Sequence, residues 1–476
     1  MSKITDENKN KEIIQSLALR IKEKGGQAYF VGGYVRDLLL GLPNKDYDIE
    51  VHNITKIELE NILDDLGGRL EFGKSFGIYN IKGYDIDIAL PRTESKTGNR
   101  HQDFKIDIDP FLSLKDSSMR RDITINAMML NVLTGEVIDF FHGKDDLKEG
   151  IIRHTDDKRF CEDPLRVLRC AQFSARFNFK IAKETIDLCK NIDISTLPKE
   201  RIFEEIKKGL LKAKKPSIFF NSLREMNQLD IWFPELKDLI GLNQRSDYHL
   251  EGDVWNHTML VIDEANKYIN KVQEPLAFML SCLLHDIGKS KCTTIVNGII
   301  RSYDHDIIGS QMAGIFLTRI ANEKKLKKYV MNMVSLHMAL NMYAANNSSI
   351  KATNKLFDKS VNPNDLAVLS ICDNFGRISE KPIVDNSSYI YNRLEIFKET
   401  MAKPYVTGSD LLDNGIKPGK DFTKLLRYAH KLRLACVDKD LALKQTLAYY
   451  NKQICKKVDW YSNNWSTNWL FFRKRV

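Results

Sequence analysis

Apolar and polar positions near the start of the chain alternate with two different periods. Residues 7–24 and 54–66 carry apolar side chains at helical spacing, and a Gly-Gly pair follows the second stretch. Residues 28–31, 77–81 and 85–90 have the length and apolar content of short strands, and the last of them alternates strictly. The pattern predicts a small domain in which helices and strands are mixed.

The rest of the chain is mainly helical in its periodicity. Residues 160–177 predict a helix with Pro164 in its first turn, and residues 180–245 are mostly helical. We therefore predict an α+β fold, in which a small mixed domain is followed by largely all-α parts. The expected division is into residues 1–150, 151–245, 246–400 and 401–476.

The first strand ends at Gly32 and Gly33, and a helical pattern follows. Glycines let a backbone approach a ligand closely, helix amides point at bound anions, and Arg36 adds a forked donor for phosphate. Asp46 and Asp48 follow at strand spacing, so both fall on one face. Two carboxylates beside a phosphate cradle predict a magnesium site, although either motif alone is more often a tight turn or a solvated strand end.

The string GGYVRD followed by DYDIEV resembles the head domain of the class II tRNA nucleotidyltransferase and bacterial poly(A) polymerase family, within the polymerase β superfamily. The resemblance implies a polymerase-β-like nucleotidyltransferase head. In it Asp46 and Asp48 hold Mg²⁺ and are catalytic, and Gly33 and Arg36 bind the nucleotide. Asp87, in the alternating strand, is either a third acidic group of that site or part of a polar strand face.

Two more segments of the head extend the resemblance. Residues 91–109 are polar and have the composition of a mobile loop beside a site. The start of this loop resembles the flexible loop of members that add CCA or A, which argues against an enzyme that adds only CC. The run RRDITINAM, which begins at Arg120, resembles the next family motif and implies that Arg121 contacts the incoming nucleotide.

The helix expected at residues 160–177 carries EDPLRVLR, in which Asp163, Arg166 and Arg169 are spaced three apart on one face. A carboxylate accepts from the amino group of cytosine or adenine, which guanine and uracil lack at the matching position. A surface ion pair is the alternative. EDPLRVLR resembles the amino-acid template motif of the family, which implies that these three residues bind CTP or ATP. Arg201 resembles a residue that supports this helix.

Histidines and acids recur between residues 257 and 373 in the order H…HD…H…H…D. Imidazole and carboxylate ligands suit transition metals, whereas a single histidine is more often a packed or surface residue. The order resembles HD-domain phosphohydrolases. It implies a helical domain with one or two ions, a divalent transition metal or Mg²⁺, that activate water against a phosphate ester. Lys289 is either a phosphate contact or solvent-facing. The implied ligands are His257, His285, Asp286, His305, His337 and Asp373.

Composition narrows the class of protein. Of 476 residues, 43% are hydrophobic and 28% charged, as in ordinary globular proteins, and 72 Lys and Arg against 63 Asp and Glu give a net charge of +9. That excess suits a polyanionic partner. The eight cysteines include no CxxC pair, which is typical of a reducing compartment. Without an apolar signal core or a long apolar run, we expect a cytoplasmic protein that does not contact a membrane.

The C-terminal part has its own signals. Residues 406–450 contain a GxxLxxxGxxPG pattern that also follows HD domains in this family, and their helices are expected to hold the tRNA body. Residues 456–476 combine three tryptophans with Lys and Arg, and such a mixture can stack on bases and neutralise phosphates. A tail without periodicity is otherwise disordered or packed on its own domain.

The combined motifs predict template-independent addition of CCA to the 3′ end of tRNA from CTP and ATP, with an accompanying HD phosphohydrolase activity. One alternative is an enzyme that adds only A, or a poly(A) polymerase, because these share the head motifs. An alternative of another class is an HD phosphohydrolase whose silent head serves only to bind RNA.

Overall fold

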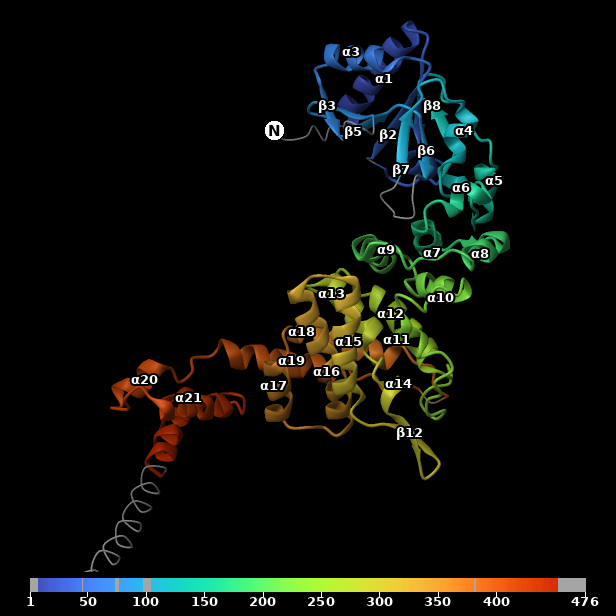
Figure 1. Cartoon of the computed structure of the whole chain (residues 1–476). Helices are drawn as coiled ribbons and strands as arrows, with labels where there is room; N and C mark the ends of the chain where they lie inside the picture. The colour runs from blue at the N-terminus through green and yellow to red at the C-terminus, as the bar shows by residue number, and fades with distance from the viewer. Residues whose placement is uncertain (1–6, 45, 73–76, 97–103, 381, 453–476) are drawn as a thin grey trace, which may run out of the picture. The chain divides into compact units, whose positions relative to one another are not determined.

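The computed structural model describes residues 7–44, 46–72, 77–96, 104–380 and 382–452. The chain divides into two compact units, whose elements are labelled in Figure 1. The first runs to Ile240 and includes Ile315–Asn322; the second comprises Gly241–Gly314 and the residues from Glu323 onward. The break after Ile240 lies close to the predicted boundary at residue 245, and the finer division remains a prediction.

In the described part of the chain, a seven-stranded sheet with the order β3-β4-β5-β2-β1-β8-β9 forms the centre of the first unit. The strand β2 pairs antiparallel with β1 and parallel with β5. The strands expected at residues 28–31, 77–81 and 85–90 are confirmed as β1, β4 and β5. The strands are β1 (Gln27–Val31), β2 (Tyr47–His52), β3 (Arg69–Phe72), β4 (Ile78–Ile81), β5 (Ile86–Ala89), β8 (Met129–Asn131) and β9 (Val137–Ile138).

Two helices pack on this sheet and share its core. These are α1 (Glu7–Glu23) and α3 (Lys56–Asp65), which confirm the helices expected at residues 7–24 and 54–66. Their apolar stripes are buried with β2, β4 and β5 in one cluster. A capping box at Thr55 starts α3. The central strand β2, at whose start the predicted acids lie, is therefore held on a well-packed support.

The polar segment at residues 91–109 differs from the prediction. Its ends form a hairpin of β6 (Arg92–Lys96) and β7 (Phe104–Ile108), paired antiparallel from Arg92 with Ile108 onward. Average composition favoured a loop, but the second strand, FKIDI, alternates apolar and polar residues as strands do. Residues 97–103, the centre of the expected loop, lie outside the described residues.

The sheet is followed by short helices that complete the first unit. The helix expected at residues 160–177 is divided, because Pro164 caps a new helix instead of lying within one. The parts before and after this break are α6 and α7. The helices are α4 (Leu114–Met119), α5 (Gly143–Glu149), α6 (Asp157–Cys161), α7 (Leu165–Phe177), α8 (Lys183–Cys189), α9 (Lys199–Leu211), α10 (Ser217–Glu225) and α11 (Pro234–Lys237).

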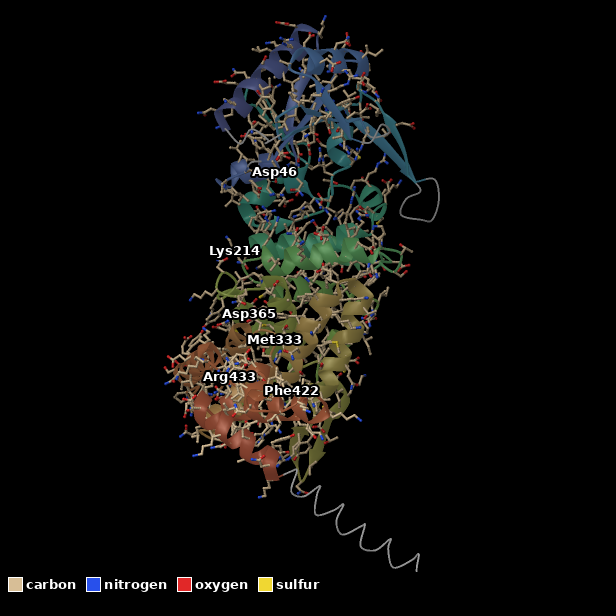
Figure 2. All side chains as sticks on the ribbon, turned by 90° about the vertical axis from the view of Figure 1, so that its left-hand side faces the viewer. Asp46, Lys214, Met333, Asp365, Phe422 and Arg433 are labelled. Atoms are coloured by element: carbon tan, nitrogen blue, oxygen red, sulfur yellow. The ribbon has the colours of Figure 1, made fainter. Side chains whose placement is uncertain are left out.

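The second unit is a helical bundle with one small hairpin, β12 (Thr293–Val296) and β13 (Ile299–Ser302). Met333 and Asp365 lie buried inside it (Figure 2). Asp365 accepts hydrogen bonds from the Tyr329 hydroxyl and from two backbone N–H groups. The helices are α12 (Val254–Asn266), α13 (Pro275–Leu284), α14 (Lys289–Cys292), α15 (His305–Ile320), α16 (Lys324–Ala345), α17 (Ile350–Lys359), α18 (Pro363–Phe375), α19 (Ser387–Ala402), α20 (Gly408–Asp413) and α21 (Lys420–Arg433).

The mixed sheet of the first unit and the helices elsewhere confirm the predicted α+β class. Among the described residues, every helix is too short or too polar to cross a membrane. The tail at residues 456–476, with its expected RNA contacts, lies outside the described residues.

Candidate functional site

The glycine turn after β1 lies against the strand that carries the predicted metal-binding acids. Gly32 has a φ of 66°, a left-handed conformation that favours glycine, and α2 (Gly33–Leu39) begins directly after it. A Cβ at Gly32 would lie 3.5 Å from Nη1 of Arg121 and 3.7 Å from Oδ2 of Asp48. The turn therefore brings backbone, carboxylate and guanidinium together at one point.

Three carboxylates gather at the end of the sheet. Asp46 lies just before β2, and Asp48 lies on β2 in register with Asp87 of the parallel strand β5. Burial raises the pKa of the Asp48 carboxyl; Arg121 opposes this shift, and the charges of Asp87 and Asp46 add to it. A bound cation relieves such crowding, so the carboxylates fit the predicted metal. The sequence left the role of Asp87 open, and the strict alternation of its strand was the signal that pointed to this residue.

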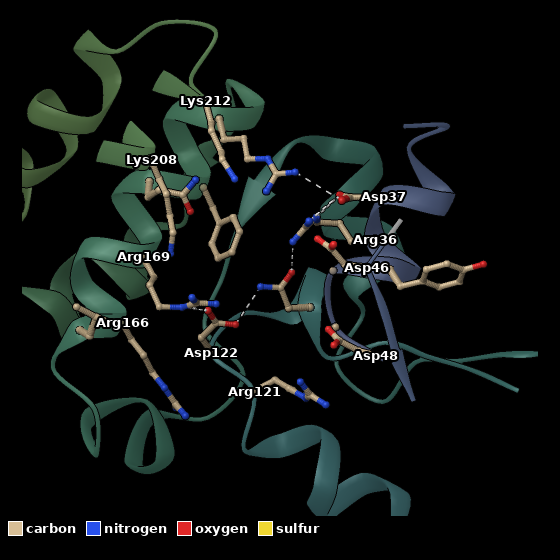
Figure 3. A pocket seen from close by; sticks show the side chains of 18 of the residues that line it. Arg36, Asp37, Asp46, Asp48, Arg121, Asp122, Arg166, Arg169, Lys208 and Lys212 are labelled. Carbon is tan, nitrogen blue, oxygen red and sulfur yellow. Dashed lines mark hydrogen bonds and ion pairs between the residues drawn. The ribbon is translucent and has the colours of Figure 1, made fainter. Parts of the chain in front are cut away.

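All the predicted head residues line one cavity of about 540 Å³ in the first unit. Figure 3 shows Asp46 and Asp48 on one side of this cavity and Arg166 and Arg169 on the other. The acids near β2 and the arginines of α7 therefore face a shared space. The predicted residues in its lining are Gly33, Arg36, Asp46, Asp48, Arg121, Asp163, Arg166 and Arg169.

Arg36 lines this cavity and is almost fully buried in its wall. Its residue is 3% exposed, and all three guanidinium nitrogens have partners. Nε and Nη2 lie 2.7 and 2.6 Å from Oδ1 of Asp37, and Nη1 donates to Asn126 at 2.6 Å. The guanidinium carbon lies 4.8 Å from the ring centroid of Phe177. These contacts fix Arg36 in the cavity wall, and its predicted grip on phosphate stays a prediction.

Hydrogen bonds continue from Arg36 to α7. Asn126 donates to Oδ1 of Asp122 at 3.0 Å, and Nε of Arg169 donates to Oδ2 of Asp122 at 2.6 Å (Figure 3). Burial alone would raise the pKa of Asp122, but the charge of Arg169 and the hydrogen bond from Asn126 outweigh it and lower the pKa to about 2. This series of hydrogen bonds fixes the position of Arg169 relative to α2, the helix that follows the glycine turn.

Asp163 and Arg166, the predicted base-selecting pair, have separate partners. Asp163 precedes the first residue of α7 and forms an ion pair with Arg201 at 3.1 Å. Nη1 and Nη2 of Arg166 donate to two backbone carbonyls at 2.7 and 2.6 Å. Asp163 and Arg166 are therefore held by these separate partners. The alternative interpretation, a surface ion pair between the two, does not describe their contacts. Arg201 supports Asp163, as the resemblance implied.

The cavity lining contains further basic residues that the sequence reasoning did not assign. Lys208 lies on α9 and Lys212 caps it, on the same cavity as Arg201. Residues 201, 208 and 212 are seven and four apart, so they fall on one helix face. Arg176 on α7 is seven residues after Arg169 and also lines the cavity. Helical spacing could have identified Lys208, Lys212 and Arg176 as neighbours of the motif residues, because those motifs were already predicted to lie on helices.

In the second unit, the six predicted metal ligands converge. They form two groups, and within each group the potential ligand atoms all lie within 4.8 Å of one another. The ligands come from α12, α15, α16, α18 and the end of α13. The groups are His257, His285 and Asp373, and Asp286, His305 and His337.

The four histidines of these groups are held in one orientation. Each places Nδ1 at 2.7–3.1 Å from an acceptor oxygen. An Nδ1–H that donates leaves Nε2 as a lone pair, and metal-binding histidines are commonly held in this way. The Nε2 atoms of the three histidines that donate to backbone carbonyls therefore offer lone pairs to the site, and Nε2 of His257 lies 3.1 Å from Oδ1 of Asp373. The acceptors are the carboxylate of Glu251 and the backbone carbonyls of Cys282, Ser302 and Val334.

Asp286 belongs to the second group and also contacts the first. Its Oδ2 is 3.2 Å from Nε2 of His285, and its Oδ1 is 3.3 Å from Nε2 of His305 and 3.6 Å from Nε2 of His337. Among the described residues, Oδ1 of Asp286 and the Nε2 atoms of His305 and His337 are buried without a well-formed hydrogen bond. Lone pairs that face one another repel unless a cation lies between them. The donor set therefore fits a metal centre.

Glu251 and His249 beside this centre were missed by the sequence reasoning. Burial acts to raise the pKa of Glu251, but hydrogen bonds from His249 and His257 outweigh it and lower the pKa well below its usual range. Lys289 lies 2.6 Å from Asp286 and donates to Gln244, so it is not simply solvent-facing, and its contact with phosphate stays a prediction. An adjoining cavity of about 270 Å³ is lined by Lys289, His249, Arg245, Tyr248 and His305.

A basic groove of about 490 Å³ lies between α17 and α21 in the second unit. On each helix the basic residues are four apart, so they share one face. Asp358, which contacts His430 at 3.0 Å, is the acid in the lining. The Lys and Arg residues that line the basic groove are Lys351, Lys355, Lys359, Arg427 and Lys431.

Comparison with solved structures agrees with this fold. The chain resembles a CCA-adding enzyme in its apo form II with a TM-score of 0.66 and 23% identity, over 93% of this chain and 96% of that chain. It resembles the Thermotoga maritima CCA-adding enzyme complexed with tRNA_CCA with a TM-score of 0.63 and 22% identity, over 94% and 96%. At these identities the likeness shows a shared fold.

Sequence comparison goes further. Residues 28–153 match the family described as the Poly A polymerase head domain, and residues 178–240 match one described as a probable RNA and SrmB-binding site of polymerase A. The chain is 36% identical over 318 residues to the multifunctional CCA protein of Haemophilus ducreyi, which covers 65% of this chain and 75% of that relative. For the multifunctional CCA protein of Cupriavidus necator the identity is 38% over 296 residues, covering 60% and 69%. With the head motifs gathered on one cavity and relatives matched over most of their length, the chain belongs to the family of multifunctional CCA proteins.

Proposed function

We propose that this protein adds C, C and A in turn to the 3′ end of tRNA, using CTP and ATP without a nucleic-acid template. One observation carries the proposal: a single cavity, lined also by Asp163, holds Asp46 and Asp48 opposite Arg166 and Arg169. A nucleotide in this cavity has its phosphates near the acids and its base near α7. Membership of the multifunctional CCA protein family supports the same reaction.

Each side chain then has a role. Asp46 and Asp48 would hold Mg²⁺, which when bound lowers the barrier for attack of the tRNA 3′ hydroxyl on the α-phosphate as pyrophosphate leaves. Arg121, beside Gly32 and Asp48, neutralises phosphate charge, and Arg169 holds the nucleotide from α7. The Asp163 carboxylate accepts from the amino group of cytosine or adenine, and Arg166 donates to ring acceptors of the base.

The basic groove supports tRNA as the partner. Its five Lys and Arg residues against one acid favour a polyanion, and phosphate contacts of this kind supply most of the affinity of nucleic-acid binding. The net charge of +9 acts in the same direction. We propose that the groove contacts the backbone of the bound tRNA.

Nucleotide incorporation tests the proposal. A tRNA that ends at the discriminator base is incubated with CTP alone, with ATP alone and with both, and the products are sequenced. We expect two C with CTP alone and CCA with both. Addition of A only to tRNA that already ends in CC would indicate an A-adding enzyme, and long A tails would indicate a poly(A) polymerase. Absence of any incorporation would overturn the proposed reaction.

We also propose metal-dependent phosphohydrolase activity for the second unit, on phosphate esters at RNA ends. The supporting observation is the convergence, among the described residues, of four histidines, Asp286 and Asp373 in two groups, with three of their buried atoms lacking a hydrogen-bond partner. These ligands would hold one or two divalent ions, which when bound activate water for attack on phosphorus. Lys289 and Arg245 in the adjoining cavity would attract the anionic ester.

Hydrolysis of bis(p-nitrophenyl) phosphate and of an RNA with a 2′,3′-cyclic phosphate, with Mg²⁺, Mn²⁺, Co²⁺ or Ni²⁺ added, tests this activity. His337→Ala should abolish it, whereas His142→Ala, at an exposed head histidine, should not. Hydrolysis that persists in His337→Ala would contradict the assignment. Hydrolysis without any nucleotide incorporation would support the alternative of a silent head.

We further propose a cytoplasmic location. The seven cysteines in the described residues are free thiols, which suits a reducing compartment. Fractionation of cells that express the tagged protein tests this; recovery with membranes or outside the cell would contradict it.

A further inference from the structure

The strand face that carries Asp48 continues to Glu50 and His52, because alternate residues of a strand share a face. Glu50 is 1% exposed, so its carboxylate faces the interior of the first unit. Oε2 of Glu50 lies 2.9 Å from Nη2 of Arg120 and 3.4 Å from Nη2 of Arg121. One carboxylate of β2 thus contacts both arginines of the RRD motif.

The other oxygen of Glu50 is equally engaged. Oε1 accepts a hydrogen bond from the Ser117 hydroxyl and lies 3.0 Å from Nε2 of His52, whose Nδ1 faces the carbonyl of Leu112 at 3.2 Å. Both oxygens of Glu50 are therefore engaged, Oε2 by two guanidinium groups and Oε1 by a hydroxyl and an imidazole, and neither is free for a metal.

Arg121 lies between this carboxylate and the cavity. Nη2 faces Glu50, whereas Nη1 lies on the side of Gly32 and Asp48. The side chain is 25% exposed and lines the cavity, while the Glu50 side chain is 1% exposed and lies behind it. A charge-assisted hydrogen bond at one end of a guanidinium fixes the direction of the donors at the other end.

We propose that Glu50 is a positioning residue that holds Arg121 so that its remaining donors face the nucleotide phosphates. The face of β2 then serves two purposes: Asp48 lies where the metal is proposed, and Glu50 orients a cation on the phosphates. This inference rests on the proposed function, because Arg121 is there assigned to the nucleotide. Glu50 itself touches neither substrate nor metal.

A double-mutant cycle tests the proposal. Glu50→Gln keeps the shape of the side chain and removes its charge. We expect the KM for CTP to rise about tenfold, with a smaller change in kcat, because a mis-set arginine weakens binding before chemistry. In an Arg121→Ala background the same Glu50→Gln change should have almost no further effect, since the arginine it positions is absent. An equal effect in both backgrounds would overturn the proposal.

The matched control is Asp146→Asn. Asp146 is also a buried carboxylate of the first unit, 5% exposed, and it contacts Arg153 and Thr124 rather than residues of the cavity. Both variants are expected to lower the melting temperature, but only Glu50→Gln should raise the KM for CTP. An unchanged KM in a folded Glu50→Gln variant overturns this inference alone. Failure of the wild-type protein to incorporate CTP would overturn the proposed function instead.

Discussion

The two sites of this protein meet the cost of burying charge in opposite ways. In the head cavity the acids and arginines already compensate one another, as in the contact of Arg169 with Asp122 at 2.6 Å. In the second unit, Asp286 and the histidines present lone pairs to each other, and three buried atoms lack a well-formed hydrogen bond. Uncompensated buried polar groups are expensive. The arginines in the wall of the first site are thus compensated before its ligands arrive, whereas the buried lone pairs of the second site leave a place that fits an ion.

This difference predicts different dependence on metal. The head cavity, at about 540 Å³, is open to a large substrate, and its metal would arrive with the nucleotide. The ligands of the second site are largely buried, and every histidine is held from behind. We therefore expect exchangeable Mg²⁺ in the head and a tightly held ion in the second unit.

The largest expected effect is at the head acids. Asp48→Ala, and likewise Asp46→Ala, should lower nucleotide incorporation by more than about 10³-fold, because loss of metal-based charge stabilisation acts on the transition state. Binding of CTP, measured by titration calorimetry, should change little, because the arginines of the cavity remain. Asp65→Ala, an exposed acid of α3, is the control. Loss of CTP binding in the same proportion as activity would contradict the metal role.

The second largest expected effect is that metal removal destabilises the second unit and not the first. Chelation should lower the free energy of unfolding of the second unit by about 3 kcal/mol, the stabilisation from a ligand present at about a hundred times its Kd. Asp286→Asn should lose the bound metal, measured by elemental analysis, and should no longer respond to chelator. Incorporation by this variant with added Mg²⁺ should stay near the wild-type level. Metal that remains bound to Asp286→Asn would remove the contrast between the sites.

Sequence reasoning reached the head site because its residues occur in short runs whose spacing fixes their faces. Asp46, Asp48 and Arg121 needed only strand alternation and a neighbouring motif to be placed together. It did not reach the contacts of the Arg36 guanidinium with Asp37 and Asn126, since no local pattern shows them. Contacts between residues far apart in sequence, such as that of Arg36 with Asn126, depend on tertiary packing.

The second site also shows which features a sequence pattern can predict and which it cannot. The ligand order was sufficient to bring six residues together, although they come from several helices far apart in the sequence. Glu251 was missed because a carboxylate that supports a histidine has no fixed spacing from it. The hairpin at residues 92–108 was missed for a different reason: its polar composition outweighed the alternation in its second strand.

A moderate effect is expected at the basic groove, away from both sites. The double variant Lys355→Glu and Arg427→Glu should raise the KM for tRNA about tenfold at physiological salt and leave the KM for CTP unchanged. The slope of log affinity against log salt should become shallower by about one for each phosphate that the variant no longer neutralises. Lys398→Glu, on α19 outside the groove, makes a charge change of the same kind and is the control. A KM for tRNA that rises equally in the control would show only a general charge effect.

The smallest expected effect is on stability and concerns Asp122, the buried acid whose charge is compensated by Arg169 and not by a metal ion. The pKa of Asp122 is about 2 in the folded protein against an ordinary 3.8, so its ion pair stabilises the fold above about pH 4 and this contribution is lost as the pH falls toward 2. Relative to Asp122→Asn, the wild type should gain about 2 kcal/mol in the free energy of unfolding at pH 6. The difference should narrow below pH 4, as measured by urea denaturation, with hydrogen exchange to assign it to α7. Chelator should leave it unchanged, because Arg169 and not a metal supplies the compensating charge. A difference that is constant with pH, or that disappears with chelator, would mean that this carboxylate is compensated in the same way as Asp286.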